Sequence, residues 1–150
     1  MPNTSFQRTL ARGGIGPLNS DGEANGDFSI NQGEISMQVN YLEIVTKEVD
    51  AVCAAYAATN GVQFGEPDAG LGNARTTAMP GGGLLGVRAP MHDTEEAVVR
   101  PYWLVDDIEA AVDAAVEAGG EVAHPPMEIP GHGTFAIYIL GGIHHGLWQR

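Results

Sequence analysis

Apolar and polar positions along residues 37–150 predict strands and helices in a regular order. Residues 37–45 are rich in strand-forming side chains. A helix is predicted next, because apolar residues recur at helical spacing at Val49, Val52, Cys53, Tyr56 and Ala57. Asn60-Gly61 ends this helix. Short strands are then predicted at residues 62–65, 74–79 and 84–88, with glycine and proline between them.

The same order begins again after a connector at residues 89–97. Residues 98–105 predict a strand, and Asp106 followed by Glu109 has the pattern of a helix N-cap. The buried stripe of this helix is expected at Ile108, Ala111, Val112, Ala115 and Val116. Strands at residues 121–123, 134–140 and 143–149 complete the second set.

Glycines and prolines mark the same backbone positions in both halves. Gly61 precedes Gly120 by the same spacing along the chain as Pro67 precedes Pro126. Gly82-Gly83 and Gly141-Gly142 repeat this spacing, and Gly86 and Gly146 repeat it with one extra position. Residues 37–90 and 98–150 are therefore interpreted as two copies of one β-α-β-β-β module.

One such module cannot bury both faces of its sheet, because its helix covers only one of them. A second copy, related by a pseudo-twofold axis, would cover part of the other face. The predicted fold class is α+β, with two modules forming a curved mixed sheet around a cleft. This single domain is expected at residues 36–150. Residues 1–35 are rich in glycine and polar residues and are predicted to be a flexible N-terminal tail.

Charge and composition exclude several kinds of partner. The chain has 150 residues and a net charge of −12, which disfavours binding to nucleic acid. No apolar stretch approaches the roughly 18 residues of a membrane span, and no secretory signal is recognised. The single Cys53 fits a reducing compartment. The sequence thus predicts a cytoplasmic protein without membrane contact.

Two segments of the second module resemble a known superfamily. They are LVDDIEAAVDAAVEAGGEV at residues 104–122 and GTFAIYILGGIHHGLWQ at residues 133–149. With the paired modules, they resemble the vicinal oxygen chelate superfamily, which includes glyoxalase I, bleomycin-resistance proteins and extradiol dioxygenases. Leu140-Gly141-Gly142 replaces the usual acidic turn before the last strand. The resemblance implies the two-module fold and a small-molecule site in the cleft.

The resemblance also implies where a metal would be held. Metal-dependent members place a ligand in the first and last strand of each module. Those positions fall on or next to Tyr41 and Gly86 in the first module, and Arg100 and Gly146 in the second. None of these residues is a usual divalent-metal ligand. The superfamily's metal site is therefore predicted to be missing.

Strand alternation gives the side chains expected to accompany those positions on the cleft face. The expected ligand-binding residues are Tyr41, Glu43, Arg88, Arg100, Tyr102, His144 and Trp148. In one interpretation, Arg88 or Arg100 binds a carboxylate or enolate of a ligand that stacks on aromatic rings. In the other, Glu43 pairs with one arginine and replaces the metal structurally.

The histidines leave a catalytic alternative open. His132 lies in a glycine-flanked loop and, with Glu43, is a candidate acid–base pair. A divalent metal at a site outside the family pattern, formed by His132, His144 and Glu43, is the alternative to a metal-free protein. His144 and His145 are adjacent on a strand and should point to opposite faces.

Three functions compete. The first is a metal-free small-molecule-binding protein, in the manner of bleomycin-resistance proteins. The second is a lyase, isomerase or dioxygenase-like enzyme with an atypical metal or a His/Glu site. The third is an accessory or regulatory subunit. The sequence leaves open whether any reaction is catalysed. A homodimer is the expected assembly.

Overall fold

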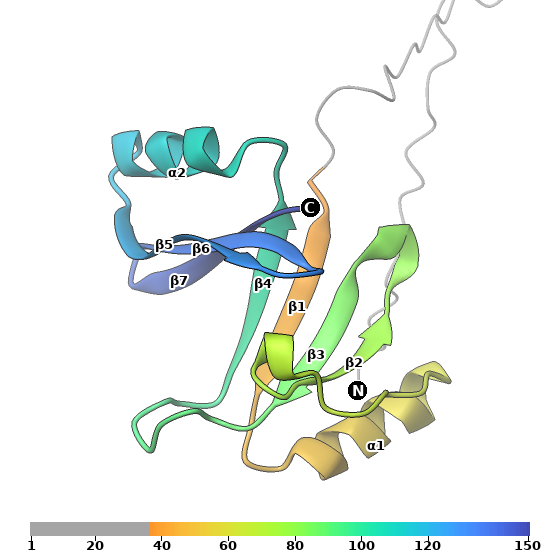
Figure 1. The fold of residues 1–150 in the computed structure, drawn as a ribbon. Helices are drawn as coiled ribbons and strands as arrows, with labels where there is room; N and C mark the ends of the chain where they lie inside the picture. Colours follow the sequence, from red (N-terminus) through yellow and green to blue (C-terminus); the bar gives the residue numbers. More distant parts are fainter. Residues whose placement is uncertain (1–36) are drawn as a thin grey trace, which may run out of the picture. The chain divides into compact units, whose positions relative to one another are not determined.

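In the computed structural model, which describes residues 37–150, one mixed sheet carries two α-helices (Figure 1). The first module contains β1 (Val39–Val45), α1 (Val49–Asn60), β2 (Arg75–Ala78) and β3 (Leu84–Arg88), with short 3-10 turns η1 (Ala69–Leu71) and η2 (Pro80–Gly82). The second contains β4 (Val98–Leu104), α2 (Ile108–Glu117), β5 (Glu121–Ile129), β6 (Gly133–Leu140) and β7 (Ile143–Gln149). The predicted tail at residues 1–35 lies outside the described residues.

The sheet order shows the internal symmetry. The seven described strands run β2-β3-β1-β4-β7-β6-β5, and the antiparallel pair β1–β4 joins the two modules. In each module the first and last strands pair in parallel, with Glu43 beside Gly86 and Tyr102 beside Gly146. Glu43 precedes Tyr102 by the same spacing as Gly61 precedes Gly120, and Gly86 precedes Gly146 by one residue more. The facing residues of the two modules therefore follow the sequence repeat. The predicted α+β fold of two related modules is confirmed.

Both helices cover one face of the sheet, each over its own module (Figure 1). In the first module, Ile44, Leu85 and Val87 pack with Cys53 of α1. In the second, Ala136 and Leu147 pack with α2 through Ile108 and Val112. Alternating strand residues therefore leave the opposite face free for the site.

Three details of the prediction are wrong. Residues 62–65 do not form a strand, because their single backbone hydrogen bond to β2 runs from the Gly65 N–H to the Thr76 carbonyl. The N-cap of α2 is Asp107, whose side chain accepts a hydrogen bond from the Ala110 N–H. Val116, expected in the buried stripe, is 47% exposed. The helix begins one residue later than Asp106 implied.

Strand β5 is longer than predicted. The predicted strand ends at residue 123, but β5 continues through Pro125 and Pro126 to Ile129. Prolines are tolerated here because β5 is the edge strand, where missing N–H groups do not interrupt a ladder. Its pairing with β6 is irregular between His124 and Met127. Within residues 37–150, neither helix is long and apolar enough to cross a membrane.

Candidate small-molecule site

Three aromatic side chains form the centre of the face opposite the helices. Tyr41 of β1, Tyr102 of β4 and Trp148 of β7 are each at most 4% exposed. Their ring centroids lie 5.4–5.7 Å apart, in tilted or edge-to-face arrangements. Each such pair contributes about 0.5–1.5 kcal/mol beyond its buried area. Because the rings come from both modules, they join the two halves of the site.

A cavity of about 170 Å³ lies beside these rings. Its apolar lining comes from both modules, through Leu71, Met91, Met127, Ile129, Phe135 and Trp148. Its polar lining is Glu43, Arg88 and the two tyrosines. The site therefore combines a mostly apolar wall with a small charged region at the β1–β3 end.

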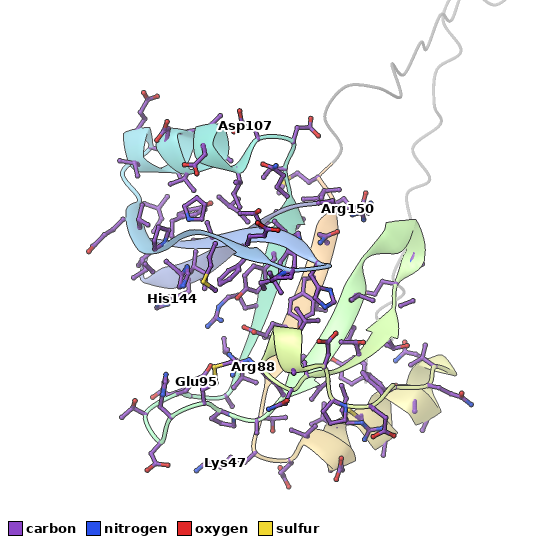
Figure 2. The ribbon with its side chains drawn as sticks, viewed as in Figure 1. Lys47, Arg88, Glu95, Asp107, His144 and Arg150 are labelled. Atoms are coloured by element: carbon purple, nitrogen blue, oxygen red, sulfur yellow. The ribbon has the colours of Figure 1, made fainter. Side chains whose placement is uncertain are left out.

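The charged region is an ion-pair network centred on Glu43. One carboxylate oxygen accepts from Arg88 Nε at 3.0 Å, and the other accepts from Arg100 Nη1 at 2.6 Å. Arg88 also donates to both oxygens of Glu95, at 2.6 and 3.1 Å. Figure 2 labels Arg88 and Glu95, which lie close together at the connector after β3. Glu43 thus pairs with both arginines, and the four charges balance.

Ionisation in the site follows from these contacts. The hydrogen bonds from Arg88 lower the pKa of Glu95 to about 2. Burial acts to lower the pKa of Arg88, but its bonds to Glu95 and Glu43 outweigh burial and raise it. Burial raises the pKa of Tyr102 to about 12 and raises that of Tyr41 as well. Both tyrosines are therefore neutral hydroxyl donors at physiological pH.

The residues on or next to the positions where the resemblance expects metal ligands are not usual ligands of a divalent cation. Tyr41 and Arg100 lie on or next to two of these expected positions, and glycines lie on or next to the other two. A Cβ at Gly86 would overlap the hydroxyl of Tyr41. A Cβ at Gly146 would lie 2.5 Å from the ring of Tyr102. Tyrosine rings thus fill the space that a ligating side chain would need.

The alternative metal set is also not assembled. Among residues 37–150, no three His, Cys, Asp or Glu side chains are grouped so that they could hold a metal ion. His144 is exposed and lines a surface pocket that includes Arg100. His145 points elsewhere and stacks on Tyr138 at 4.9 Å, as strand alternation predicted. Whether the protein uses a metal stays a prediction.

His132 has a partner that the sequence did not reveal. Its Nε2 lies 3.0 Å from Oδ2 of Asp68, and its carbonyl accepts a hydrogen bond from Trp148 Nε1 at 2.9 Å. His132 lines a second cavity of about 530 Å³ that shares Tyr41 and Trp148 with the first. Asp68 also caps η1 through the Gly70 N–H. The role of Asp68 in a turn can be predicted from sequence, but its contact with His132 of the other module cannot.

The structure therefore gathers most of the predicted site. Of the predicted ligand-binding residues, Tyr41, Glu43, Arg88, Tyr102 and Trp148 line the 170 Å³ cavity. Arg100 reaches it through Glu43, and His144 lies outside its lining. The sequence analysis missed part of the apolar wall, which comes from η1, the connector and β5. These segments carry no periodic pattern of apolar residues. The missed residues are Leu71, Met91, Met127 and Ile129.

Comparison with known proteins supports the fold. No protein-family model matches the chain. The mycobacterial protein CFP32, provisionally named a glyoxylase, is 29% identical over 116 residues in both Mycobacterium bovis and Mycobacterium tuberculosis. The match covers 73% of this chain but only 44% of those relatives. The chain thus spans less than half the length of the curated relatives it matches.

Solved structures give the same assignment. A hypothetical protein of Bacillus halodurans aligns with a TM-score of 0.62 at 13% identity, over 77% of this chain and 96% of that one. Methylmalonyl-CoA epimerase of Mycobacterium tuberculosis aligns with a TM-score of 0.58 at 15% identity, over 74% of this chain and 86% of the epimerase chain. The glyoxylase and epimerase relatives belong to the vicinal oxygen chelate superfamily. The predicted resemblance is confirmed, and the chain has the fold of this superfamily.

Proposed function

We propose that the chain binds a small, neutral, mostly apolar or aromatic molecule in the cavity between its modules, without the superfamily's metal site. The observation that carries this proposal is the aromatic and aliphatic wall around the 170 Å³ cavity. A cavity of about 150 Å³ lined by apolar side chains stays dry and accepts benzene. The cavity thus has the size and lining for a compact aromatic ligand.

The charge balance favours a neutral ligand. Arg88 uses four of its five N–H groups to bind the carboxylates of Glu43 and Glu95 and the carbonyl of Ala89. A ligand carboxylate at Arg88 would have to displace one of these carboxylates, and breaking a buried ion pair is costly. The net charge of −12 also disfavours an anion. Arg88 is therefore assigned to the Glu43 network instead of to a ligand carboxylate.

Binding of toluene, followed by NMR of methionine methyl groups, tests this function. Met91 and Met127 line the cavity, so their signals should shift with saturation while those of methionines outside the lining stay fixed. Benzoate should bind at least tenfold more weakly. Shifts spread evenly over all methionines, or tighter binding of benzoate, would contradict the proposal.

A cavity-filling variant supplies the control for this experiment. Met127→Trp places a large ring at the cavity wall and should abolish toluene binding without unfolding the domain. Val122→Trp is the matched control, because Val122 lies on the same strand β5 but pairs with Tyr138 of the helix-side core. That variant should bind toluene as the unmodified chain does.

The pair of His132 and Asp68 favours a second candidate, an acid–base enzyme. Asp68 can orient the imidazole at the second cavity, which would let His132 move a proton of a bound ligand. In this form of the enzyme alternative, His132 works with Asp68 instead of Glu43. Exchange of the methyl protons of acetophenone with deuterium oxide, faster than in buffer and lost in His132→Gln, would support it. Exchange at the buffer rate would reject it.

The structural neighbours include Streptomyces coelicolor methylmalonyl-CoA epimerase variants in complex with 2-nitronate-propionyl-CoA, which supports small-molecule binding on this fold.

The homodimer and the cytoplasmic location stay proposals. Sedimentation of the full chain at high concentration tests the dimer. A species of monomer mass alone would reject it.

A further inference from the structure

We propose that the hydroxyl of Tyr41 is the polar anchor of the cavity, and that the ligand therefore carries a neutral hydrogen-bond acceptor such as a ketone oxygen. This inference rests on the proposed function and narrows its ligand class. It assigns to one atom the task of orienting a mostly apolar molecule.

The hydroxyl of Tyr41 lacks a partner in the described part of the chain. The side chain is 3% exposed, and its oxygen forms no hydrogen bond with residues 37–150. A buried polar group without a partner is costly and uncommon in native proteins. A phenylalanine would avoid this cost while keeping the ring contacts. The hydroxyl is therefore expected to serve a bound molecule.

The other polar groups on the aromatic rings, and both oxygens of Glu43, already have partners. Trp148 Nε1 donates to the carbonyl of His132 at 2.9 Å, and the Tyr102 hydroxyl donates to Glu43 at 3.4 Å. Each carboxylate oxygen of Glu43 already accepts from an arginine. Among the aromatic polar groups lining the cavity, the Tyr41 hydroxyl is thus the one that remains unpaired within residues 37–150.

Packing holds the Tyr41 ring in place. The absence of a Cβ at Gly86 makes room for the hydroxyl, and the rings of Tyr102 and Trp148 lie 5.7 and 5.4 Å away. Tyr41 lines both cavities, but its hydroxyl lies against Gly86, whose cross-strand neighbour Glu43 lines the 170 Å³ cavity and not the larger one. An acceptor is therefore expected to approach from the 170 Å³ cavity. A small shift of the lining is required, because the oxygen is enclosed, and the unbranched Met91 side chain is suited to it.

The surroundings select the kind of group that can bind. Burial keeps the Tyr41 phenol protonated by raising its pKa, so it offers a donor. A ligand carboxylate at the Tyr41 hydroxyl would lie close to the negative charge of Glu43, to which Arg88 and Arg100 each already donate a hydrogen bond. A ketone or ether oxygen accepts the hydrogen bond without adding charge. The buried Nε of Arg100 also lacks a partner in this part of the chain. Arg100, however, lines the surface pocket that includes His144 and does not line the 170 Å³ cavity.

Two ligands of the same shape test the inference. Acetophenone and α-methylstyrene differ only in a carbonyl oxygen against a methylene group. Calorimetric titration of the full chain should give similar affinities for α-methylstyrene with the unmodified protein and with Tyr41→Phe. The affinity for acetophenone should fall about fivefold or more in Tyr41→Phe, because the hydrogen bond is lost. Tyr138→Phe, a change in the helix-side core, should leave both affinities unchanged.

The outcomes separate this inference from the proposed function. If both compounds bind and Tyr41→Phe weakens them equally or not at all, the anchor is wrong and the apolar site stands. If neither compound binds the unmodified chain, both proposals fail. Thermal unfolding without ligand shows whether Tyr41→Phe is folded, and a selective loss of acetophenone binding by the folded variant would support the anchor.

Discussion

Two neighbouring cross-strand pairs at the junction of the modules differ sharply in chemistry. Tyr41 of β1 lies beside Tyr102 of β4, and Glu43 of β1 lies beside Arg100 of β4. The sequence repeat, at the spacing that separates Gly61 from Gly120, maps Tyr41 onto Arg100 and Glu43 onto Tyr102. The pseudo-twofold axis therefore maps the aromatic pair onto the ionic pair.

The two modules share their backbone geometry but differ in the side chains at equivalent positions. The backbone register and the facing glycines are shared by both modules. The side chains are not, so one equivalent position pair builds an aromatic wall and the other builds a buried ion-pair network. A symmetric scaffold thus holds an asymmetric site, with an apolar region beside a charge-balanced one.

Removal of Glu43 should have the largest effect on this comparison. Glu43→Ala leaves Arg88 and Arg100 without their shared carboxylate, and both side chains are at most 14% exposed. Loss of one partner from a buried ion pair costs about 3–5 kcal/mol. Urea denaturation measures the change in the free energy of unfolding.

The surface pair of Arg75 and Asp50 is the matched control. The Asp50 side chain is 92% exposed, so Asp50→Ala should cost only about 0.2–1 kcal/mol. Equal losses in the two variants would mean that the Glu43 network is as weak as a surface pair.

Gly86→Ala tests the aromatic pair. The new Cβ would overlap the Tyr41 hydroxyl, and such overpacking costs about 1–3 kcal/mol. Gly65→Ala is the control, because a Cβ there meets nothing nearer than the Thr76 carbonyl at 3.8 Å. Denaturation of both variants measures the difference. A neutral Gly86→Ala would show that Tyr41 is free to move away from β3.

The bond between Arg88 and Glu95 should make stability depend on acid pH. The folded pKa of Glu95 is about 2, below its ordinary value of 4.5, so the stabilisation is complete above pH 4.5. It is lost as the pH falls towards 2. Allowing for partial exposure, Glu95→Gln should remove on the order of 1 kcal/mol at pH 6 and little at pH 2.

Denaturation between pH 2 and 6 checks this prediction. Glu96→Gln is the comparison, since Glu96 is the exposed neighbour on the same connector. A difference between the Glu95 variant and the unmodified chain that stays constant over this range would argue against the ion pair.

The smallest effect is expected from the two tyrosine hydroxyls. Tyr41→Phe removes a hydroxyl that has no partner within residues 37–150, so ligand-free stability should be unchanged or slightly higher. Tyr102→Phe removes the 3.4 Å bond to Glu43 and should cost at most about 1 kcal/mol. Thermal unfolding of both variants shows whether each change raises or lowers the stability of the ligand-free protein. A larger loss in Tyr41→Phe would indicate a partner for its hydroxyl outside residues 37–150.

The strands and the cleft face were largely predictable, but the closing walls were not. Alternation placed Tyr41, Glu43 and Tyr102 on one face, and the glycine repeat set the register of β3 and β7. Prediction failed where tertiary context overrode local signals. Examples are β5, which continues through two prolines because it is an edge strand, and Asp68, whose contact with His132 joins residues 64 positions apart.

By itself, the sequence determined the doubled module, the helix and strand faces, and the glycines that stand at equivalent places in the last strand of each module. Periodicity and glycine spacing are local properties that the chain carries directly. Only the tertiary structure decided that Glu43 serves both arginines, that tyrosine rings fill the space over Gly86 and Gly146, and that the Tyr41 hydroxyl lacks a partner in residues 37–150. Those features depend on distances between side chains from different strands, which no local pattern encodes.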